Sequence, residues 1–548
     1  MHPQVGYLVG RNQRAKKYPH RQEAILMAKR YVLGIDTGTS AVKAVLADMQ
    51  GAEVAVAAEN TPVENPHEGW SEFDLQQDWM SVSRAIRRLL DETRVDPDQI
   101  LTIGVTGKGW GCCYLNERFE PARKGILWND ARSGPYIADW AKSGVLAEGC
   151  RISGNYFYTG DCGPVTRWLL DHEPGTARRV ATIIFPPAWI VLRLTGKVKL
   201  VYGDASSLFD IRQRAFSDRL FEILGITSMR DKFPVPTSCT EVAGEVTREA
   251  AEATGLKAGT PVVLGEVDVS SCATGVGVVE RGDVCIILGT AHIVSICLDE
   301  PIFEPEVGLM MTYVDGKYLK LVPPAIATPN VDWYLDTFGH ADRDAAMAAN
   351  QDVFQYLDGK LSGIAPGADG VIYHPYLSPM GERCPFTKLT AKANLFGLAA
   401  HHTRHHILKA IYEGVAFSAL DSLTACQLPI GKVMLSGGGA RSPVWGQVEA
   451  DVLGKTVRVP AGTEFGARGA ILTALVAMGV YPDHQSAIRS TITQERMYAP
   501  DPANHAIYQE IFQLYRDITR HLWVDWDQRA EILAHARGLD VRASGRES

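Results

Sequence analysis

The chain has 548 residues, of which 46% are hydrophobic and 22% are charged, so it is long enough to bury two cores of ordinary size. Its formal net charge of −8 argues against a nucleic-acid surface, which needs a clustered basic excess. No apolar run reaches membrane-spanning length, and the ten cysteines include no CxxC pair. We therefore expect a cytoplasmic protein with reduced, buried thiols and with neither a nucleic-acid nor a membrane partner.

The first thirty residues differ in composition from the rest of the chain. They carry seven Lys and Arg side chains against a single acid, Glu23, and they lack the apolar centre of a secretory signal. We predict that residues 1–26 form a disordered extension and that the folded part begins near Met27.

The first predicted element is a β-hairpin over residues 32–48, in which two apolar segments flank an acidic, glycine-bearing turn. Gly38 lets backbone amides approach an anion closely, and the hydroxyl groups of Thr39 and Ser40 are further donors. Asp36, at the end of the first segment, could hold Mg²⁺ directly or through water. The turn is thus a candidate phosphate site, and an ordinary hairpin turn is the alternative.

Strand-like and helix-like segments then alternate, as is typical of an α/β protein. Val54–Ala57 and Leu101–Val105 are apolar and predict strands. Asp78–Leu90 predicts a helix, because its apolar residues recur every three or four positions.

Two further apolar strands in the second half end in glycines. The strand 286–288 is followed by Gly289 and Thr290, which predicts a second phosphate hairpin. The strand 433–435 is followed by a glycine-rich turn, and Ser442 before Pro443 is a good helix start. The residues of that turn, which would contact adenosine, are Gly437, Gly438, Gly439 and Ala440. Three such sites in this order suggest an ATP cleft between two related α/β domains.

These segments resemble the FGGY family of carbohydrate kinases, and the resemblance covers roughly residues 31 to 530. Besides the glycine sites, it rests on the segments Trp128–Arg132, Gly265–Gly275, Tyr376–Pro385 and Ala393–Glu413. The family shares the fold of actin and hexokinase. The resemblance therefore implies an α/β fold with two actin/hexokinase-like (ribonuclease H-like) domains around an ATP and sugar cleft.

The resemblance also implies a division of the chain. We expect an N-terminal sugar-binding domain over 31–276, a C-terminal nucleotide-binding domain over 277–485 and a C-terminal helical segment over 486–535. The hinge would lie just after residues 275–277. The last segment is expected to form a long amphipathic helix that packs back across the domains.

The resemblance assigns the chemistry of ATP as follows. Asp268 would be the catalytic base that accepts the proton of the attacking hydroxyl, and an N-cap of the following helix is the alternative role. Asp36 would organise Mg²⁺ and phosphate. The residues expected to contact ATP are Asp36, Gly38, Thr39, Ser40, Gly289, Thr290, Gly437, Gly438, Gly439 and Ala440.

The sugar site is expected around a glycine-rich segment at residues 107–111. It reads Gly-Lys-Gly-Trp-Gly where pentulose kinases commonly read Gly-Gln-Met-His-Gly, which is closer to the L-xylulose and erythritol kinase branches. Trp110 could stack on an apolar sugar face, with core packing as the alternative. Asp130 would accept sugar hydroxyls, with Arg132 as its partner or as a structural brace. The residues expected to contact the substrate are Lys108, Trp110, Asp130, Arg132 and Asp268.

We therefore predict an enzyme that uses ATP and Mg²⁺ to phosphorylate a primary hydroxyl of a small sugar or polyol. A ketopentose such as L-xylulose or xylulose is favoured over erythritol and other polyols. The alternative from another class is a sugar or nucleotide sensor without catalysis on the same fold. The oligomeric state, with a homodimer as the candidate, is left open.

Overall fold

The computed structural model describes residues 30–204, 206–303, 307–324 and 326–536. The expected extension, residues 1–26, and the polar tail from residue 537 onward lie outside this part of the chain. Each helix in the described part is too short or too polar to cross a lipid bilayer.

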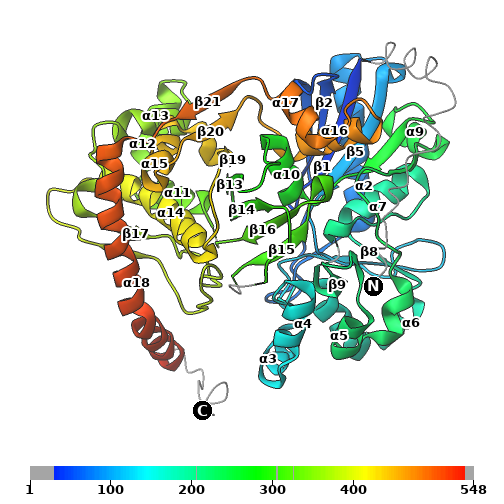
Figure 1. Cartoon of the computed structure of the whole chain (residues 1–548), viewed down its shortest axis with the longest axis horizontal. Helices are drawn as coiled ribbons and strands as arrows, with labels where there is room; N and C mark the ends of the chain where they lie inside the picture. The colour runs from blue at the N-terminus through cyan, green and yellow to red at the C-terminus, as the bar shows by residue number, and fades with distance from the viewer. Residues whose placement is uncertain (1–29, 205, 304–306, 325, 537–548) are drawn as a thin grey trace, which may run out of the picture.

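Two mixed β-sheets form the centres of the two halves of the molecule (Figure 1). The first has the spatial order β11-β12-β5-β1-β2-β3 and consists of β1 (Tyr31–Thr37), β2 (Ala41–Asp48), β3 (Glu53–Asn60), β5 (Ile100–Gly107), β11 (Val242–Glu245) and β12 (Pro261–Leu264). The second has the order β15-β16-β14-β13-β19-β20-β21 and consists of β13 (Val284–Leu288), β14 (His292–Leu298), β15 (Leu309–Thr312), β16 (Tyr318–Val322), β19 (Val433–Ser436), β20 (Val457–Pro460) and β21 (Glu495–Tyr498).

Short two-stranded sheets lie outside these centres. They pair β4 (Glu72–Phe73) with β7 (Gly125–Ile126), β6 (Cys113–Leu115) with β8 (Thr182–Ile184), β9 (Phe209–Asp210) with β10 (Ala215–Phe216), and β17 (Ile372–His374) with β18 (Asn394–Phe396).

The two large sheets follow the same plan at their centres. β1 and β2 form an antiparallel hairpin with β5 parallel to β1, and β13 and β14 form an antiparallel hairpin with β19 parallel to β13. The central strands β1, β5, β13 and β19 are apolar almost throughout, because both of their faces are covered. Both predicted hairpins and the predicted strands around Val54 and Leu101 are confirmed.

Helices cover the faces of both sheets. Those that precede β13 in the chain are α2 (Leu75–Thr93), α3 (Gly134–Ser143), α4 (Val145–Ser153), α5 (Cys162–His172), α6 (Pro174–Arg179), α7 (Pro186–Thr195), α8 (Asp218–Ile223), α9 (Arg248–Thr254) and α10 (Asp268–Val276). The later ones are α11 (Thr328–Thr337), α12 (His340–Ala348), α13 (Val353–Leu361), α14 (Arg404–Cys426), α15 (Pro443–Leu453), α16 (Phe465–Ala477), α17 (His484–Thr491) and α18 (Pro502–Ala536).

Two helix starts show how the sequence sets these boundaries. The predicted helix around Asp78 is α2, and its N-cap Asp74 accepts a hydrogen bond from the backbone amide of Gln77 at 2.9 Å. The predicted helix after the glycine triplet is α15, whose N-cap Ser442 accepts from the amide of Trp445 at 3.0 Å. Both predictions are confirmed.

The two halves meet where α10 crosses α16. Figure 1 shows α16 beside β1 and β5, so a helix that comes late in the chain covers the first sheet. The close crossing depends on glycines, because a Cβ atom at Gly275 would collide with the carbonyl oxygen of Phe465, and one at Gly469 with that of Ser271. The expected boundary at residues 276 and 277 thus separates the two sheets but not all the helices that cover them.

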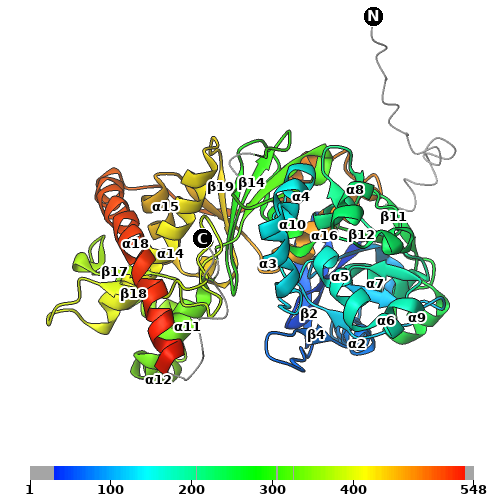
Figure 2. The same ribbon diagram turned by 90° about the horizontal axis from the view of Figure 1, so that it is seen from below.

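The C-terminal segment differs from the expectation. It contains the strand β21, which extends the second sheet, before α18 begins. The buried residues of α18, among them Tyr508, Phe512 and Tyr515, pack with α14, α15 and β17, and the backbone oxygen of Tyr515 lies 3.0 Å from His374 Nε2. The helix therefore covers the second half instead of spanning both halves (Figure 2).

The cysteine prediction agrees with the structure. The ten cysteines, all within the described residues, form no disulfide bonds with one another, and each is buried except Cys150, which is partly exposed. Burial raises the pKa of the Cys113 thiol, which keeps this side chain in its neutral form.

Candidate active site

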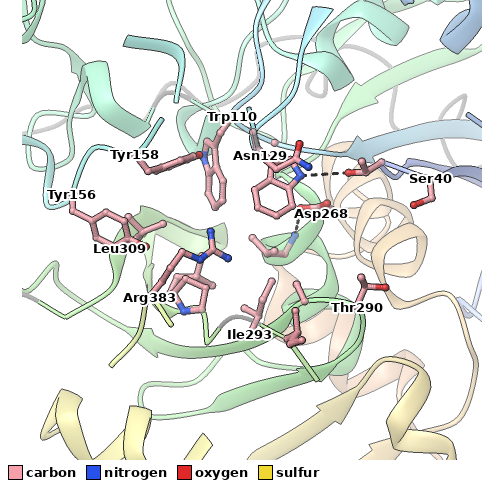
Figure 3. A pocket seen from close by; sticks show the side chains of 18 residues that line it. Ser40, Trp110, Asn129, Tyr156, Tyr158, Asp268, Thr290, Ile293, Leu309 and Arg383 are labelled. Carbon is pink, nitrogen blue, oxygen red and sulfur yellow. Dashed lines mark hydrogen bonds between the residues drawn. The ribbon is translucent and has the colours of Figure 1, made fainter. Parts of the chain in front are cut away.

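A cavity of about 440 Å³ lies between the two halves of the molecule, and the turns of both hairpins reach it (Figure 3). This volume lies within the range of small-molecule sites. From the first half it is lined by Thr39, Ser40, Gly109, Trp110, Trp128, Asn129, Tyr156, Tyr158, Asp268 and Val269. From the second half it is lined by Thr290, Ala291, Ile293, Leu309, Leu321, Pro323, Ile326 and Arg383.

The turn between β1 and β2 presents hydroxyl groups to this cavity. The hydroxyl of Thr39 accepts a hydrogen bond from Trp128 Nε1 at 3.4 Å, and its carbonyl oxygen accepts one from Thr61 Oγ1 at 3.1 Å. Ser40 follows on the exposed side of the turn, and Gly38 is half-buried at the bend. The two contacts of Thr39 hold the turn in place, so that Ser40 remains available to a ligand.

Asp36 lies at the end of β1, directly across the hairpin from Lys43. Burial raises its pKa to about 6, although the positive charge of Lys43 opposes that change. Lys43 is itself paired with Glu464, at 2.6 Å. The Oδ1 atom of Asp36 is buried and has no hydrogen-bond partner within the described chain. A carboxylate oxygen left free in this way is the kind of ligand that Mg²⁺ prefers.

Asp268 is the first residue of α10 and lines the cavity. Burial and the negative charge of Asp36 raise its pKa to about 7, although its Oδ1 accepts a hydrogen bond from the Val269 amide at 2.7 Å. The negative charge of Asp36 therefore favours the protonated form of Asp268, and a divalent cation held by Asp36 would relieve that repulsion. The residues present fit a magnesium ion. Asp268 thus contacts the start of α10 through the Val269 amide and also lines the cavity.

The second hairpin and the glycine-rich turn lie together in the second half. Thr290 is exposed and lines the cavity, whereas Gly289 is half-buried behind it. A Cβ atom at Gly437 would lie 2.5 Å from the Leu288 carbonyl oxygen, so this glycine lets the turn pack against the end of β13. Gly438 is exposed, with no atom closer than 4.0 Å to the position of a Cβ. That open backbone could lie against a flat ring.

Two of the residues expected at adenosine are placed differently from their neighbours. Gly439 and Ala440 are buried, and a Cβ at Gly439 would lie 2.9 Å from the Trp445 ring. Gly439 and Ala440 thus form the buried part of the turn. The exposed backbone of this segment is therefore at Gly438, with Gly437 half-buried beside it.

Trp110 reaches the cavity from an unusual backbone conformation. Its φ angle is +60°, in the left-handed region that side chains with a Cβ rarely adopt. Such a residue costs of order 1–3 kcal/mol and persists where the surrounding structure requires it. Its indole Nε1 is buried and has no hydrogen-bond partner among the described residues. The strained backbone thus places the Trp110 ring at the cavity, while its Nε1 is buried.

Three residues expected to contact the sugar do not line the cavity. Lys108 is 1% exposed and paired with Asp78 at 2.7 Å. The Oδ1 atom of Asp130 accepts from Arg132 Nε at 2.8 Å, and its Oδ2 accepts from the backbone amide of Ser71 at 2.7 Å. These charges are engaged with partners inside the protein, behind the wall that carries Trp110. The direct sugar contacts of Lys108, Asp130 and Arg132 stay predictions.

Sequence reasoning assigned no role to three residues that the structure brings to the cavity. Tyr156 and Tyr158 lie in an irregular segment without a motif, so no local signal marked them. Arg383 belongs to the segment Tyr376–Pro385, which was recognised without a function for this side chain. Figure 3 shows all three beside Leu309, on the side of Asp268 away from Ser40 and Thr290.

Comparison with known proteins agrees with this geometry. Residues 31–275 match the model of the FGGY family of carbohydrate kinases, N-terminal domain, and residues 284–478 match that of its C-terminal domain. The chain belongs to the FGGY family of carbohydrate kinases. It is therefore a kinase that phosphorylates a sugar-type substrate, and family membership implies ATP as the phosphoryl donor.

Curated relatives align with this kinase along almost their whole length. The probable L-xylulose kinase of Pasteurella multocida is 29% identical over 501 residues, which cover 90% of this chain and 99% of that protein. The L-xylulose/3-keto-L-gulonate kinase of Escherichia coli is 28% identical and covers 89% and 96%. The erythritol kinase of Brucella abortus is 29% identical and covers 91% and 98%.

The fold also matches solved structures of such kinases. The xylulose kinase from Rhodospirillum rubrum superimposes with a TM-score of 0.80 at 26% identity, covering 91% of this chain and all of that one. The predicted fold class, two actin/hexokinase-like domains, is confirmed.

Proposed function

We propose that this kinase transfers the terminal phosphoryl group of ATP to a primary hydroxyl of a small open-chain ketose, with Asp268 as the base. The observation that carries the proposal is the position of Asp268 in a cavity reached by the turns of both hairpins. Its pKa of about 7 suits a group that must take up a proton near neutral pH.

The residues around the cavity divide the work of the transfer. The hydroxyl groups of Ser40 and Thr290 donate hydrogen bonds to phosphate oxygens from the two halves. The carboxylate of Asp268 orients the attacking hydroxyl and accepts its proton as the new bond forms. Asp36 would hold Mg²⁺, which when bound supplies neutralisation of phosphate charge.

Closure of the cavity completes this arrangement. The nucleotide turn belongs to the second half, whereas Trp110 and Asp268 belong to the first, so both ligands are enclosed only when the halves approach each other. Closure around the reactants excludes water, which would otherwise compete for the phosphoryl group.

L-xylulose and related pentuloses are the first candidates for the acceptor, because two of the relatives above are named for L-xylulose. An erythritol-like polyol is the second candidate, because the erythritol kinase is as similar in identity as the first of these relatives. A sensor without catalysis is disfavoured, since a protein that only binds has no use for a base at Asp268.

The test is ADP release measured against a panel of four- to six-carbon ketoses and polyols, with the phosphorylated carbon located by NMR. We expect acceptor-dependent ADP release and a phosphate on a primary hydroxyl. Nucleotide binding without phosphorylation of any acceptor would contradict the proposal and support the sensor.

A further inference from the structure

A second cavity, of about 240 Å³, borders the segment that carries Asp268. Glu266 lines this second cavity, whereas Asp268, two residues later in the chain, lines the first one. Both halves of the molecule contribute to its walls, because Glu266 comes from the first half and Thr312 and Gly316 come from the second. Gly316 is exposed, so the second cavity opens to solvent at this residue and a ligand need not pass through the first cavity.

Three charged residues line the second cavity, and two of them already have partners. Arg214 donates a hydrogen bond to the carbonyl oxygen of Gly316 at 2.5 Å, and Asp315 Oδ1 lies 2.7 Å from His484 Nδ1. Glu266 is only 4% exposed; within the described residues it has no ion pair, and its Oε2 has no hydrogen-bond partner. A carboxylate buried in this way is costly unless a ligand supplies the opposite charge.

The two oxygens of the Glu266 carboxyl group have different surroundings. Oε2 packs against Gly203, where a Cβ atom would lie 2.1 Å away, and this contact leaves Oε1 on the side of the cavity. The next residue, Asp204, adds a second carboxyl group that is 1% exposed and has no partner for either oxygen in the described part of the chain. Burial raises the pKa of Glu266 to about 7, and burial together with the charge of Glu266 raises the pKa of Asp204. A cation at Oε1 would relieve the repulsion between these groups.

The remaining lining of the second cavity combines hydroxyl groups with hydrocarbon. The hydroxyl oxygens of Ser238 and Thr240 are 2.9 Å apart, and both residues are half-buried. Val314, Val476 and Pro482 contribute apolar surface. A bare metal ion would leave that apolar surface in contact with water. An ammonium group on a short hydrocarbon chain fits both parts, since its N–H groups donate to oxygens and its chain packs on the apolar side chains.

We propose that the second cavity binds a small primary amine in its ammonium form, with Glu266 as the anchor. The inference goes beyond the proposed function and does not depend on it. The three N–H donors of a primary ammonium group match one carboxylate oxygen and the hydroxyl oxygens of Ser238 and Thr240. The contact with Glu266 is charge-assisted, which makes it the strongest of the three.

The first test compares the charged ligand with a neutral one of similar shape. Calorimetry of the full chain without nucleotide, at about pH 8 so that a carboxyl with a pKa of about 7 is ionised, is run with propylammonium, butylammonium and butane-1,4-diammonium chlorides. Butan-1-ol is the neutral match of butylammonium. We expect butylammonium to bind roughly 10- to 100-fold more tightly than butan-1-ol, as for hydrogen bonds to a charged group.

The second test changes the anchor. Glu266→Gln should weaken amine binding roughly 10- to 100-fold, because the amide has the same shape without the charge. Thr240→Val, which removes one hydroxyl at a half-buried position, should weaken it roughly threefold to tenfold and provides a second variant if Glu266→Gln does not fold. The control Glu245→Gln removes an equal charge from an exposed position on β11 and should leave the affinity unchanged.

A third variant separates the second cavity from the first. Asp268→Asn removes the carboxylate of the first cavity and should keep the amine affinity within about threefold of the wild type. Loss of amine binding in Asp268→Asn, with binding retained in Glu266→Gln, would place the amine in the first cavity and overturn the proposal.

Three further results would contradict an amine site. Equal affinities for butylammonium and butan-1-ol would show that charge is not recognised. Tighter binding of K⁺ or Mg²⁺ alone, with displacement of the amine, would assign the second cavity to an inorganic cation. Absence of binding by all three amines up to about 10 mM would exclude the site. Each of these results leaves the proposed kinase activity standing, because ADP release with sugar acceptors is measured separately.

Discussion

The two central hairpins have the same architecture but a different charge. In the first, Asp36 precedes the turn, with its free carboxylate oxygen and its pKa of about 6. In the second, apolar Leu288 leads directly into Gly289 and Thr290, and the turn offers only amides and a hydroxyl. In the proposed function the repeated hairpin thus supplies donors for phosphate in both halves, whereas a carboxylate suited to a metal ion is present only in the first.

Asp268 lines the cavity with both hairpin turns but is electrostatically coupled to the first hairpin. It comes from the first half, and its pKa responds to Asp36 across the site. This coupling places both acidic groups of the proposed site in the first half, and in the proposed function the second half holds the nucleotide. Variants of single residues can therefore separate the roles of the two hairpins.

The largest expected effect is that of Asp268→Asn. The amide keeps the shape of the side chain but cannot accept a proton, so kcat should fall about 10²- to 10⁴-fold with little change in ATP affinity. Steady-state kinetics and nucleotide calorimetry measure the two quantities. Near-normal turnover would contradict the role of Asp268 as the base.

Asp36→Asn tests the charged hairpin. We expect kcat/KM for ATP to fall roughly 10- to 100-fold and the Mg²⁺ concentration for half-maximal rate to rise, because a metal ligand is lost. Titration of Mg²⁺ at fixed ATP measures both. The control Asp91→Asn removes an exposed carboxylate on α2 and should leave both unchanged. An unaltered Mg²⁺ requirement in Asp36→Asn would remove the proposed difference between the hairpins.

Thr290→Val tests the uncharged hairpin. Loss of one hydroxyl donor should lower kcat by roughly tenfold and leave the Mg²⁺ requirement at the wild-type value. The same titration applied to this variant sharpens the comparison. If Thr290→Val raised the Mg²⁺ requirement as Asp36→Asn is expected to, the second hairpin would share the metal site.

Glu449, a buried carboxyl away from both hairpins, shows how a raised pKa affects stability at a position where no ligand site is proposed. Both carboxylate oxygens of Glu449, on α15, lack partners in the described chain, and burial raises its pKa to about 8. Because the folded pKa lies above the unfolded value, the stabilising contribution of the neutral form is lost as pH rises through about 8. Glu449→Gln should therefore stabilise the protein by about 1–3 kcal/mol at pH 9 relative to pH 5, with activity unchanged.

Urea unfolding at the two pH values measures this effect. Glu117→Gln, at an exposed position, is the matched control and should show no pH-dependent gain. An equal gain in both variants would mean that the proton linkage does not come from Glu449.

The sequence predicted the parts of the site that follow local rules. Four site residues each end or follow an apolar strand: Asp36, Ser40, Asp268 and Thr290. Their common position near strand ends could therefore be inferred from the chain alone. The ion pair of Lys108 could not be inferred from the chain, because its partner Asp78 lies thirty residues away on α2.

The residues on the side of the cavity away from the hairpins could not be predicted for the same physical reason. Tyr156, Tyr158 and Arg383 come from irregular segments, and only the packing of the two halves brings them together. The packing of α16 on the first sheet could not be inferred either, since it depends on contacts between residues far apart in the chain, such as Gly34 and Ala467. Local sequence patterns thus predicted the hairpins, whereas the cavity wall that contains Tyr156, Tyr158 and Arg383 depends on long-range packing.

The pH dependence of kcat/KM for the acceptor, measured from pH 5 to pH 9 in the wild type and in Asp268→Asn, tests the central claim most directly. A base with a pKa of about 7 must be ionised to act, so the wild-type value should rise with pH and level off above about pH 7. The variant should lose that rise along with most of its activity. A flat wild-type profile, or the same rise in both proteins, would contradict the assignment of Asp268 as the base that serves both hairpins.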